Sequence, residues 1–193
     1  MKFSATKLAS VISDLRSGGG YMGGLVKTPY DHLGAYDTVS TAHALIPLLL
    51  RPAMRPDDVL VDVGCGKGRI LHWAAQSGQF KAMFGIELDK RVAAVVANRF
   101  ADNMDVTIVA GDALTSLPDS ATLLYLWNPF DHNVMRRFCD AVISKYSRLG
   151  TLGQLRIVYH NALHVQVWHD AACTITPISL PDSPHRAVAI TFQ

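Results

Sequence analysis

A glycine-rich loop at residues 62–68, with the sequence DVGCGKG, contains the residue types and spacing that most clearly imply chemistry. It follows an apolar run that ends at Val63. Glycines permit positive φ and let a ligand lie against the backbone, and free N–H groups at the start of a following helix favour a carboxylate or a phosphate. The dinucleotide-binding pattern GxGxxG would need its third glycine at position 69, which is Arg69. The spacing therefore favours a ligand other than a dinucleotide.

Two acidic residues end the next two predicted strands. Glu87 lies in the sequence GIELD at residues 85–89, roughly 20 residues after the glycines, where a carboxylate is suited to bind ribose hydroxyls. Asp112 lies in the sequence AGDA at residues 110–113 and again follows a strand. Because parallel sheets bind ligands at the carboxyl ends of their strands, we expect both acids beside the glycine-rich loop.

In this order, the three elements resemble the motifs of class I S-adenosylmethionine (SAM)-dependent methyltransferases, over about residues 57–160. The resemblance implies that the loop holds the methionine part of SAM, that Glu87 binds the ribose and that Asp112 lies near the adenine amine. It implies SAM as cofactor and S-adenosylhomocysteine as product. The cofactor-binding residues that we predict are Tyr36, Thr38, Asp62, Gly64, Cys65, Gly66, Gly68, Arg69, Glu87, Leu88, Asp112, Ala113 and Asn128.

The catalytic residues that we predict are Asn128, Pro129 and Phe130, at the end of the fourth strand. They resemble the Asn-Pro-Pro-aromatic motif of amine methyltransferases, which implies that Asn128 accepts a hydrogen bond from the target nitrogen and that Phe130 packs the acceptor or the sulfonium. This chain has one proline where that motif has two. The alternative is a turn that merely ends the strand.

The lead-in before the loop contains Tyr36 and Thr38. It is similar to the Tyr-x-x-Thr lead-in of small lysine methyltransferases, which implies that both residues line the methionine end of the cofactor. Alternatively, Tyr36 is a packed aromatic residue and Thr38 a helix cap. Tyr30 competes with Tyr36 for the same role.

Histidines raise two alternatives. His160 and His164 are four residues apart, as on one face of a helix, but no Glu lies between them as a hydrolytic base would, so we predict no metal site. His132 or His160 could act as a general base if the acceptor were a hydroxyl, although a solvated loop histidine is the simpler interpretation of both.

Strands and helices alternate along the chain, which predicts right-handed crossovers and a parallel sheet. The fold class that we predict is α/β, a Rossmann-like, doubly wound, mostly parallel sheet of seven strands with an antiparallel C-terminal hairpin strand. A helix capped at Thr38 or Ser40 should carry Ala42 to Leu50. The predicted strands are residues 59–63, 82–86, 106–109, 122–126, 154–159, 173–178 and 186–192, and the other predicted helices are 8–15, 69–76, 90–100, 134–146 and 162–168.

Length and composition predict one compact domain, with a lead-in at residues 1–55 that could fold over the cofactor as a lid and a SAM-binding domain at residues 56–193. The net charge of +2 and the absence of a run of Lys or Arg do not favour nucleic acid as a partner. Three widely spaced cysteines fit a reducing cytoplasm, and no segment is long and apolar enough to span a membrane.

Together these features predict a SAM-dependent methyltransferase whose acceptor is a nitrogen on a protein or a small molecule. One alternative is transfer to an oxygen or carbon of a metabolite. Another is a non-catalytic, SAM-binding regulatory protein. The fold by itself does not specify the acceptor or the oligomeric state.

Overall fold

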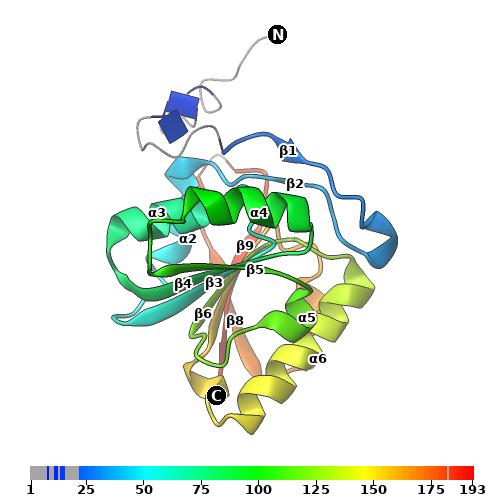
Figure 1. The fold of residues 1–193 in the computed structure, drawn as a ribbon. Helices are drawn as coiled ribbons and strands as arrows, with labels where there is room; N and C mark the ends of the chain where they lie inside the picture. Colours follow the sequence, from blue (N-terminus) through cyan, green and yellow to red (C-terminus); the bar gives the residue numbers. More distant parts are fainter. Residues whose placement is uncertain (1–7, 9–10, 13, 16–21, 182) are drawn as a thin grey trace.

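The computed structural model describes residues 8, 11–12, 14–15, 22–181 and 183–193, and its centre is a seven-stranded sheet with helices on both faces (Figure 1). The strand order is β5-β4-β3-β6-β7-β9-β8, in which β9 pairs antiparallel with both β7 and β8 and the other neighbouring strands pair parallel. This is the predicted fold. The strands are β3 (Asp58–Val63), β4 (Phe80–Glu87), β5 (Val106–Ala110), β6 (Leu123–Trp127), β7 (Arg156–His160), β8 (Cys173–Ile178) and β9 (Ala187–Phe192).

Central strands are buried on both faces because their side chains alternate between two cores. In β3, Val61 and Val63 pack into one core and Leu60 into the other. Tyr125 of β6 lies in the same core as Leu60, while its neighbour Leu124 lies in the opposite one. A continuous apolar run is what such a two-sided strand requires.

Helices α2, α3 and α4 cover one face of the sheet, and α5 and α6 cover the other (Figure 1). Side chains of Asp89, Asp112 and Asp131 cap α4, α5 and α6 by accepting backbone N–H bonds. The helices are α2 (Ile46–Leu50), α3 (Arg69–Ser77), α4 (Lys90–Arg99), α5 (Ala113–Ser116) and α6 (His132–Arg148), with 3-10 turns η1 (Asp31–Leu33), η2 (His43–Leu45), η3 (Leu152–Gln154) and η4 (Val165–Trp168).

The lead-in differs from its prediction. Thr38 does not cap a helix, because it lies in β2 (Thr38–Val39), which pairs antiparallel with β1 (Leu25–Val26). The helix begins only at the 3-10 turn η2. Pro47 explains the late start, since proline lacks an N–H and fits only the first turn of a helix. A helix from Ser40 would have placed this proline in its interior.

Two further points concern the edges of the fold. The predicted helix at residues 162–168 is the shorter 3-10 turn η4. Of the predicted helix at residues 8–15, the structure describes Leu8, Val11, Ile12, Asp14 and Leu15 in helical conformation, and the others lie outside the described residues. Among the described residues, no helix is both long and apolar enough to cross a bilayer.

Candidate active site

The site lies where the chain changes direction across the sheet. From β3 the chain adds β4 and β5 on one side, and later adds β6 and β7 on the other. The crevice outside the carboxyl ends of the strands at this switch point is the usual position for a ligand in this fold. The cleft there is lined by Thr28, Ala35, Tyr36, Gly64, Ile86, Glu87, Leu88, Gly111, Asp112, Ala113, Pro129 and Phe130.

The glycine-rich loop separates this cleft from a second one. Gly64 has a φ of 74°, and a Cβ atom at this position would lie 3.2 Å from the Cβ of Pro129, so the loops after β3 and β6 are nearly in contact. The second cleft lies beside Gly64 and is lined by Ser40, Thr41, Asp62, Cys65, Gly66, Lys67, Arg69, Ile70, Tyr125 and Trp127. Both clefts border Gly64, as a ligand crossing the loop requires.

Glu87 closes the base of the first cleft and is fixed by the backbone. Its carboxylate accepts bonds from the N–H of Gly66 at 2.9 Å and from the N–H of Asp89 at 3.0 Å. Burial raises the pKa of Glu87 above its ordinary value. The carboxylate thus faces the cleft in a fixed orientation, as the binding of ribose hydroxyls would require.

Asp62 lies beneath the glycine-rich loop, and its side chain is 3% exposed. Burial raises its pKa to about 8, and the negative charge of Glu87 adds to the shift. Ionisation of Asp62 beside Glu87 is therefore unfavourable, and a positively charged ligand next to the two carboxyl groups would favour it.

The remaining predicted cofactor residues take three kinds of position. Leu88, Asp112 and Ala113 line the first cleft, and Asp112 also caps α5 through the N–H of Leu114 at 2.9 Å. Cys65 is buried at the second cleft. For Thr38 the backbone lies in β2, but its side chain is outside the described part of the structure.

The loop after β6 holds the predicted catalytic residues in a strained conformation. Asn128 is buried and has a φ of 39°, in the left-handed region that Asn tolerates better than most residues. The hydroxyl of Tyr159 donates to its Oδ1 at 2.6 Å. The carbonyl of Pro129 accepts from the N–H of Tyr36 at 3.1 Å, and Phe130 forms a β-bridge with Ala35.

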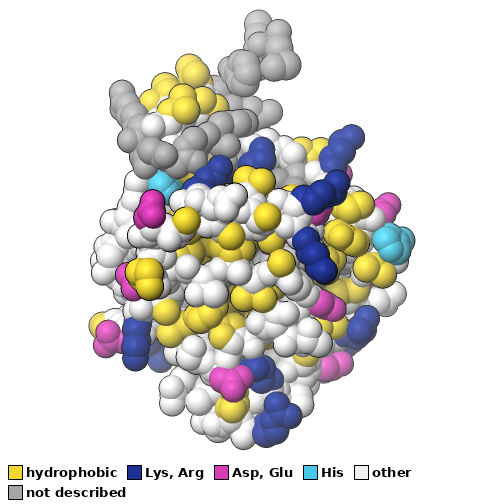
Figure 2. Space-filling view, viewed as in Figure 1, with side chains coloured by type: hydrophobic (Ala, Val, Ile, Leu, Met, Phe, Trp, Pro, Cys, Tyr) yellow, Lys and Arg dark blue, Asp and Glu magenta, His cyan; other side chains and the backbone are white. Residues whose placement is uncertain are grey.

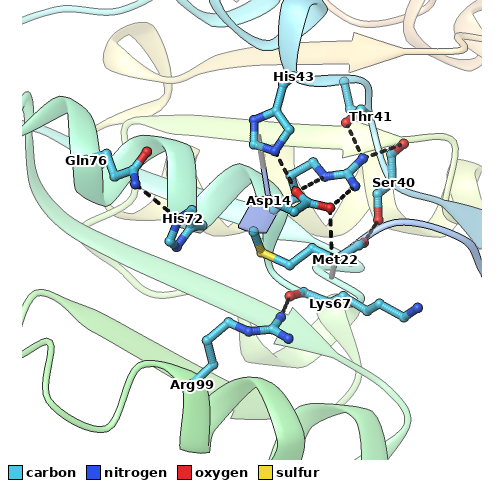
Figure 3. Close-up of polar contacts among 10 residues, drawn as sticks. Asp14, Met22, Ser40, Thr41, His43, Lys67, His72, Gln76 and Arg99 are labelled. Carbon is cyan, nitrogen blue, oxygen red and sulfur yellow. Dashed lines mark hydrogen bonds and ion pairs between the residues drawn. The ribbon is translucent and has the colours of Figure 1, made fainter. Parts of the chain in front are cut away.

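A buried ion pair attaches the N-terminal segment to the glycine-rich loop (Figure 3). The Arg69 guanidinium donates to both carboxylate oxygens of Asp14, at 3.0 and 2.5 Å, and His43 contacts the same carboxylate at 2.6 Å. Lys67 donates to the carbonyl of Gly23 at 2.6 Å. Burial alone would raise the pKa of Asp14, but the bonds from Arg69 and His43 hold it below its ordinary value. Arg69, predicted as a cofactor residue, therefore lines the second cleft while paired with Asp14.

His160 lies apart from His132 and His164. His160 is 1% exposed, its Nδ1 lies 3.1 Å from the hydroxyl of Tyr125, and burial lowers its pKa to about 4, with a smaller contribution from His185. It therefore remains neutral inside the sheet. His132 is exposed at the start of α6, and His164 contacts Tyr36 at the rim of the first cleft.

Comparison with known proteins agrees with this geometry. Residues 60–151 match the family described as Methyltransferase domain. The chain is 41% identical, over 61 residues, to a ribosomal RNA small subunit methyltransferase A of Geobacter metallireducens; the matched segment covers 32% of this chain and 22% of that protein. Residues 60–151 therefore form a methyltransferase domain, and the fold and the order of the loops are those of class I SAM-dependent methyltransferases, whose methyl donor is SAM.

Solved structures share the fold at low sequence identity. A tRNA (m1A22) methyltransferase of B. subtilis superposes with a TM-score of 0.64 at 10% identity, covering 80% of this chain and 67% of that one. A precorrin-6y C5,15-methyltransferase of Geobacter metallireducens gives 0.59 at 14% identity, covering 80% and 90%. The prediction that nucleic acid is an unlikely partner is wrong, since the curated relative and the B. subtilis protein are both named as RNA methyltransferases. The net charge is a sum over the whole chain, so it does not show whether basic side chains gather at one site where RNA could bind.

Asp62 leads to a pH-dependent prediction. Its pKa of about 8 means that most of the carboxyl is protonated at pH 7, and the ammonium of the methionine part of SAM should favour its ionised form. Binding at pH 7 should therefore release roughly one proton, which calorimetric titration in two buffers of different ionisation enthalpy would measure. Asp62→Asn should abolish the buffer dependence. Equal heats for the wild type in both buffers would refute the expectation.

The raised pKa of Asp62 also affects the stability of the unliganded protein. Between the ordinary pKa of 3.8 and the folded value of about 8, the folded state keeps a proton that the unfolded chain has released. Rising pH across this window therefore lowers the free energy of unfolding. The wild type should lose stability with pH more steeply than Asp62→Asn does.

Proposed function

We propose that the protein transfers the methyl group of SAM to a nitrogen of an RNA base. The observation that carries this proposal is the close approach of the loop after β6 to the glycine-rich loop, because Pro129 and Phe130 of the first loop and Gly64 of the second line the same cleft. An acceptor held by the first loop would lie next to a methyl donor held by the second. The RNA methyltransferases among the similar proteins support RNA as the acceptor.

In this reaction the protein would act mainly by positioning the acceptor nitrogen next to the methyl group. The nitrogen lone pair would form a bond to the methyl carbon as the C–S bond breaks and its electrons go to sulfur, and an amino nitrogen would then release its proton to water. Asn128 is suited to orient the acceptor, since a carbonyl oxygen has two lone pairs and Tyr159 occupies one of them. The other can accept from an amino group on the base and fix its direction of approach.

Basic side chains at the mouth of the cleft support a phosphate-bearing acceptor. Figure 2 shows Lys and Arg side chains over α4 and beside the segment that follows β1. Lys27, Lys90 and Arg91 are exposed in these segments. Lys27 adjoins Thr28, and Lys90 lies two residues after Leu88, and both Thr28 and Leu88 line the cleft. Such side chains would contact the RNA backbone without reading its sequence.

The test is transfer of a labelled methyl group from SAM to RNA isolated from a strain that lacks the gene, followed by nuclease digestion and mass spectrometry. We expect one N-methylated nucleoside in the RNA. Label found only in the protein or small-molecule fractions, or in none, would overturn the proposal.

Variants of the acceptor loop should separate chemistry from binding. Asn128→Gly suits the positive φ and removes the side chain, so kcat should fall about 100-fold while the Kd for SAM stays within a factor of about two. Tyr159→Phe removes only the hydroxyl that orients Asn128, and kcat should fall about tenfold. If both variants kept the wild-type kcat, Asn128 would have no role in transfer.

A further inference from the structure

Four side chains from three distant segments meet at the rim of the first cleft. Tyr36 comes from the lead-in, His132 from the start of α6, and His164 and Gln166 from the segment after β7. The hydroxyl of Tyr36 lies 3.3 Å from Nε2 of His164, and the amide nitrogen of Gln166 lies 3.4 Å from Nδ1 of His132. We name this group, Tyr36, His132, His164 and Gln166, the rim corner.

The rim corner presents flat surfaces rather than covering them. Tyr36 and His164 meet through the hydroxyl and a ring nitrogen, with ring centroids 6.1 Å apart and planes inclined by 34°. Rings that meet at their edges do not cover each other's faces, and Tyr36 and His132 are exposed. The ring plane of His132 is inclined by 77° to that of His164, with centroids 5.8 Å apart, so these two rings are nearly perpendicular.

This group is continuous with the acceptor loop. Tyr36 lines the first cleft, and its N–H donates to the carbonyl of Pro129. A Cβ atom on Gly34 would lie 2.6 Å from a methyl of Val134, so the lead-in packs closely against α6 and fixes Tyr36 in place. The tyrosine side chain is nevertheless 39% exposed, whereas Pro129 is buried.

The chemistry of the rim corner favours one kind of occupant. Its rings offer apolar faces, and its edges carry the hydrogen-bonding groups of His132, His164 and Gln166. A nucleobase has the same combination of flat apolar faces and polar edges, and unpaired RNA bases are commonly bound on aromatic and histidine rings.

We propose that the rim corner stacks the base that flanks the acceptor nucleotide in RNA. This inference rests on the proposed function, because the acceptor base itself would occupy the deeper position beside Pro129 and Phe130. The rim corner would then hold the neighbouring nucleotide just outside the cleft. It would contribute to RNA binding and to the preference for the sequence around the acceptor, and it would not contribute to SAM binding.

A short oligoadenylate containing one 2-aminopurine tests the inference directly, because stacking quenches the fluorescence of this base. With S-adenosylhomocysteine present, the wild type should bind and quench it, and His164→Leu should raise the Kd about tenfold and lose most of the quenching. His164→Phe keeps an aromatic face and should restore both. His169→Leu, an exposed histidine of the same segment outside the rim corner, is the matched control and should behave as wild type.

Two outcomes separate this inference from the proposed function. If His164→Leu binds and quenches the probe as the wild type does, the inference is overturned whether or not RNA is methylated. Where RNA is methylated, His164→Leu should raise KM for RNA about tenfold and leave kcat and the Kd for SAM unchanged. A fall in kcat with no change in KM would also overturn it. Absence of methyl transfer to RNA by the wild type would instead refute the proposed function.

Discussion

Replacing Glu87 by alanine should weaken SAM binding about 100-fold without unfolding the protein. The carboxylate is positioned by the N–H groups of Gly66 and Asp89 and lines the first cleft, where it is suited to accept from the ribose hydroxyls. Hydrogen bonds to a charged group contribute about 1.5–3 kcal/mol each, so the loss of two corresponds to at least about 3 kcal/mol. Calorimetric titration of SAM, with circular dichroism to check folding, measures the change.

Glu87→Gln is the matched control for this experiment. Glutamine keeps an oxygen that can accept from Gly66 but lacks the charge, so the Kd should rise only about tenfold. It also removes the negative charge that helps to raise the pKa of Asp62, and should therefore reduce the proton release on SAM binding. A folded Glu87→Ala variant with the wild-type Kd would show that the first cleft is not the ribose site.

Sequence patterns predicted the central part of the fold because its signals are local. The strand that ends at Val63 is a short continuous apolar run, and Glu87 follows the next such run at a fixed spacing from the glycines. Neither feature depends on contacts with distant residues. The carboxyl edge of a parallel sheet then brings the loops together through topology alone.

The lead-in and the supporting contacts could not be predicted in the same way. The pairing of β2 with β1 and the bridge from Ala35 to Phe130 are long-range interactions that leave no periodic pattern in the sequence. Pro47 was a local signal that could have shifted the helix start. Tyr159 supports Asn128 from 31 residues away, and Asp14 reaches Arg69 across 55, so neither pairing could be inferred from spacing.

The prediction from composition that nucleic acid is an unlikely partner failed for a related physical reason. Eighteen basic and sixteen acidic residues nearly cancel over the whole chain. Recognition depends on where the charges lie, and the exposed Lys27, Lys90 and Arg91 lie in segments that border the first cleft. Contacts to phosphate and stacking on rings need few net charges, so a small overall charge does not exclude RNA.

The ion pair between Asp14 and Arg69 suggests a role for the N-terminal segment as a wall of the second cleft. Asp14→Asn would leave the guanidinium buried without a counter-charge, which costs about 3 kcal/mol and should lower the Tm by roughly 10 °C. Since Arg69 directly follows the glycine-rich loop and Lys67 also contacts the segment, the Kd for SAM should rise about tenfold. Thermal unfolding and calorimetric titration give the two values.

A second buried ion pair provides the control for that experiment. Asp58 and Arg156 are buried to a similar degree but lie at the opposite end of β3 from the glycine-rich loop. Asp58→Asn should lower the Tm by a similar amount and leave the Kd for SAM unchanged below its transition. If the two variants lost equal stability and both kept the wild-type Kd, the N-terminal segment would stabilise the fold without forming part of the cofactor site. The pKa of Asp14 lies below its ordinary 3.8, so its contribution to stability should be complete above that pH and fade as the pH falls below it.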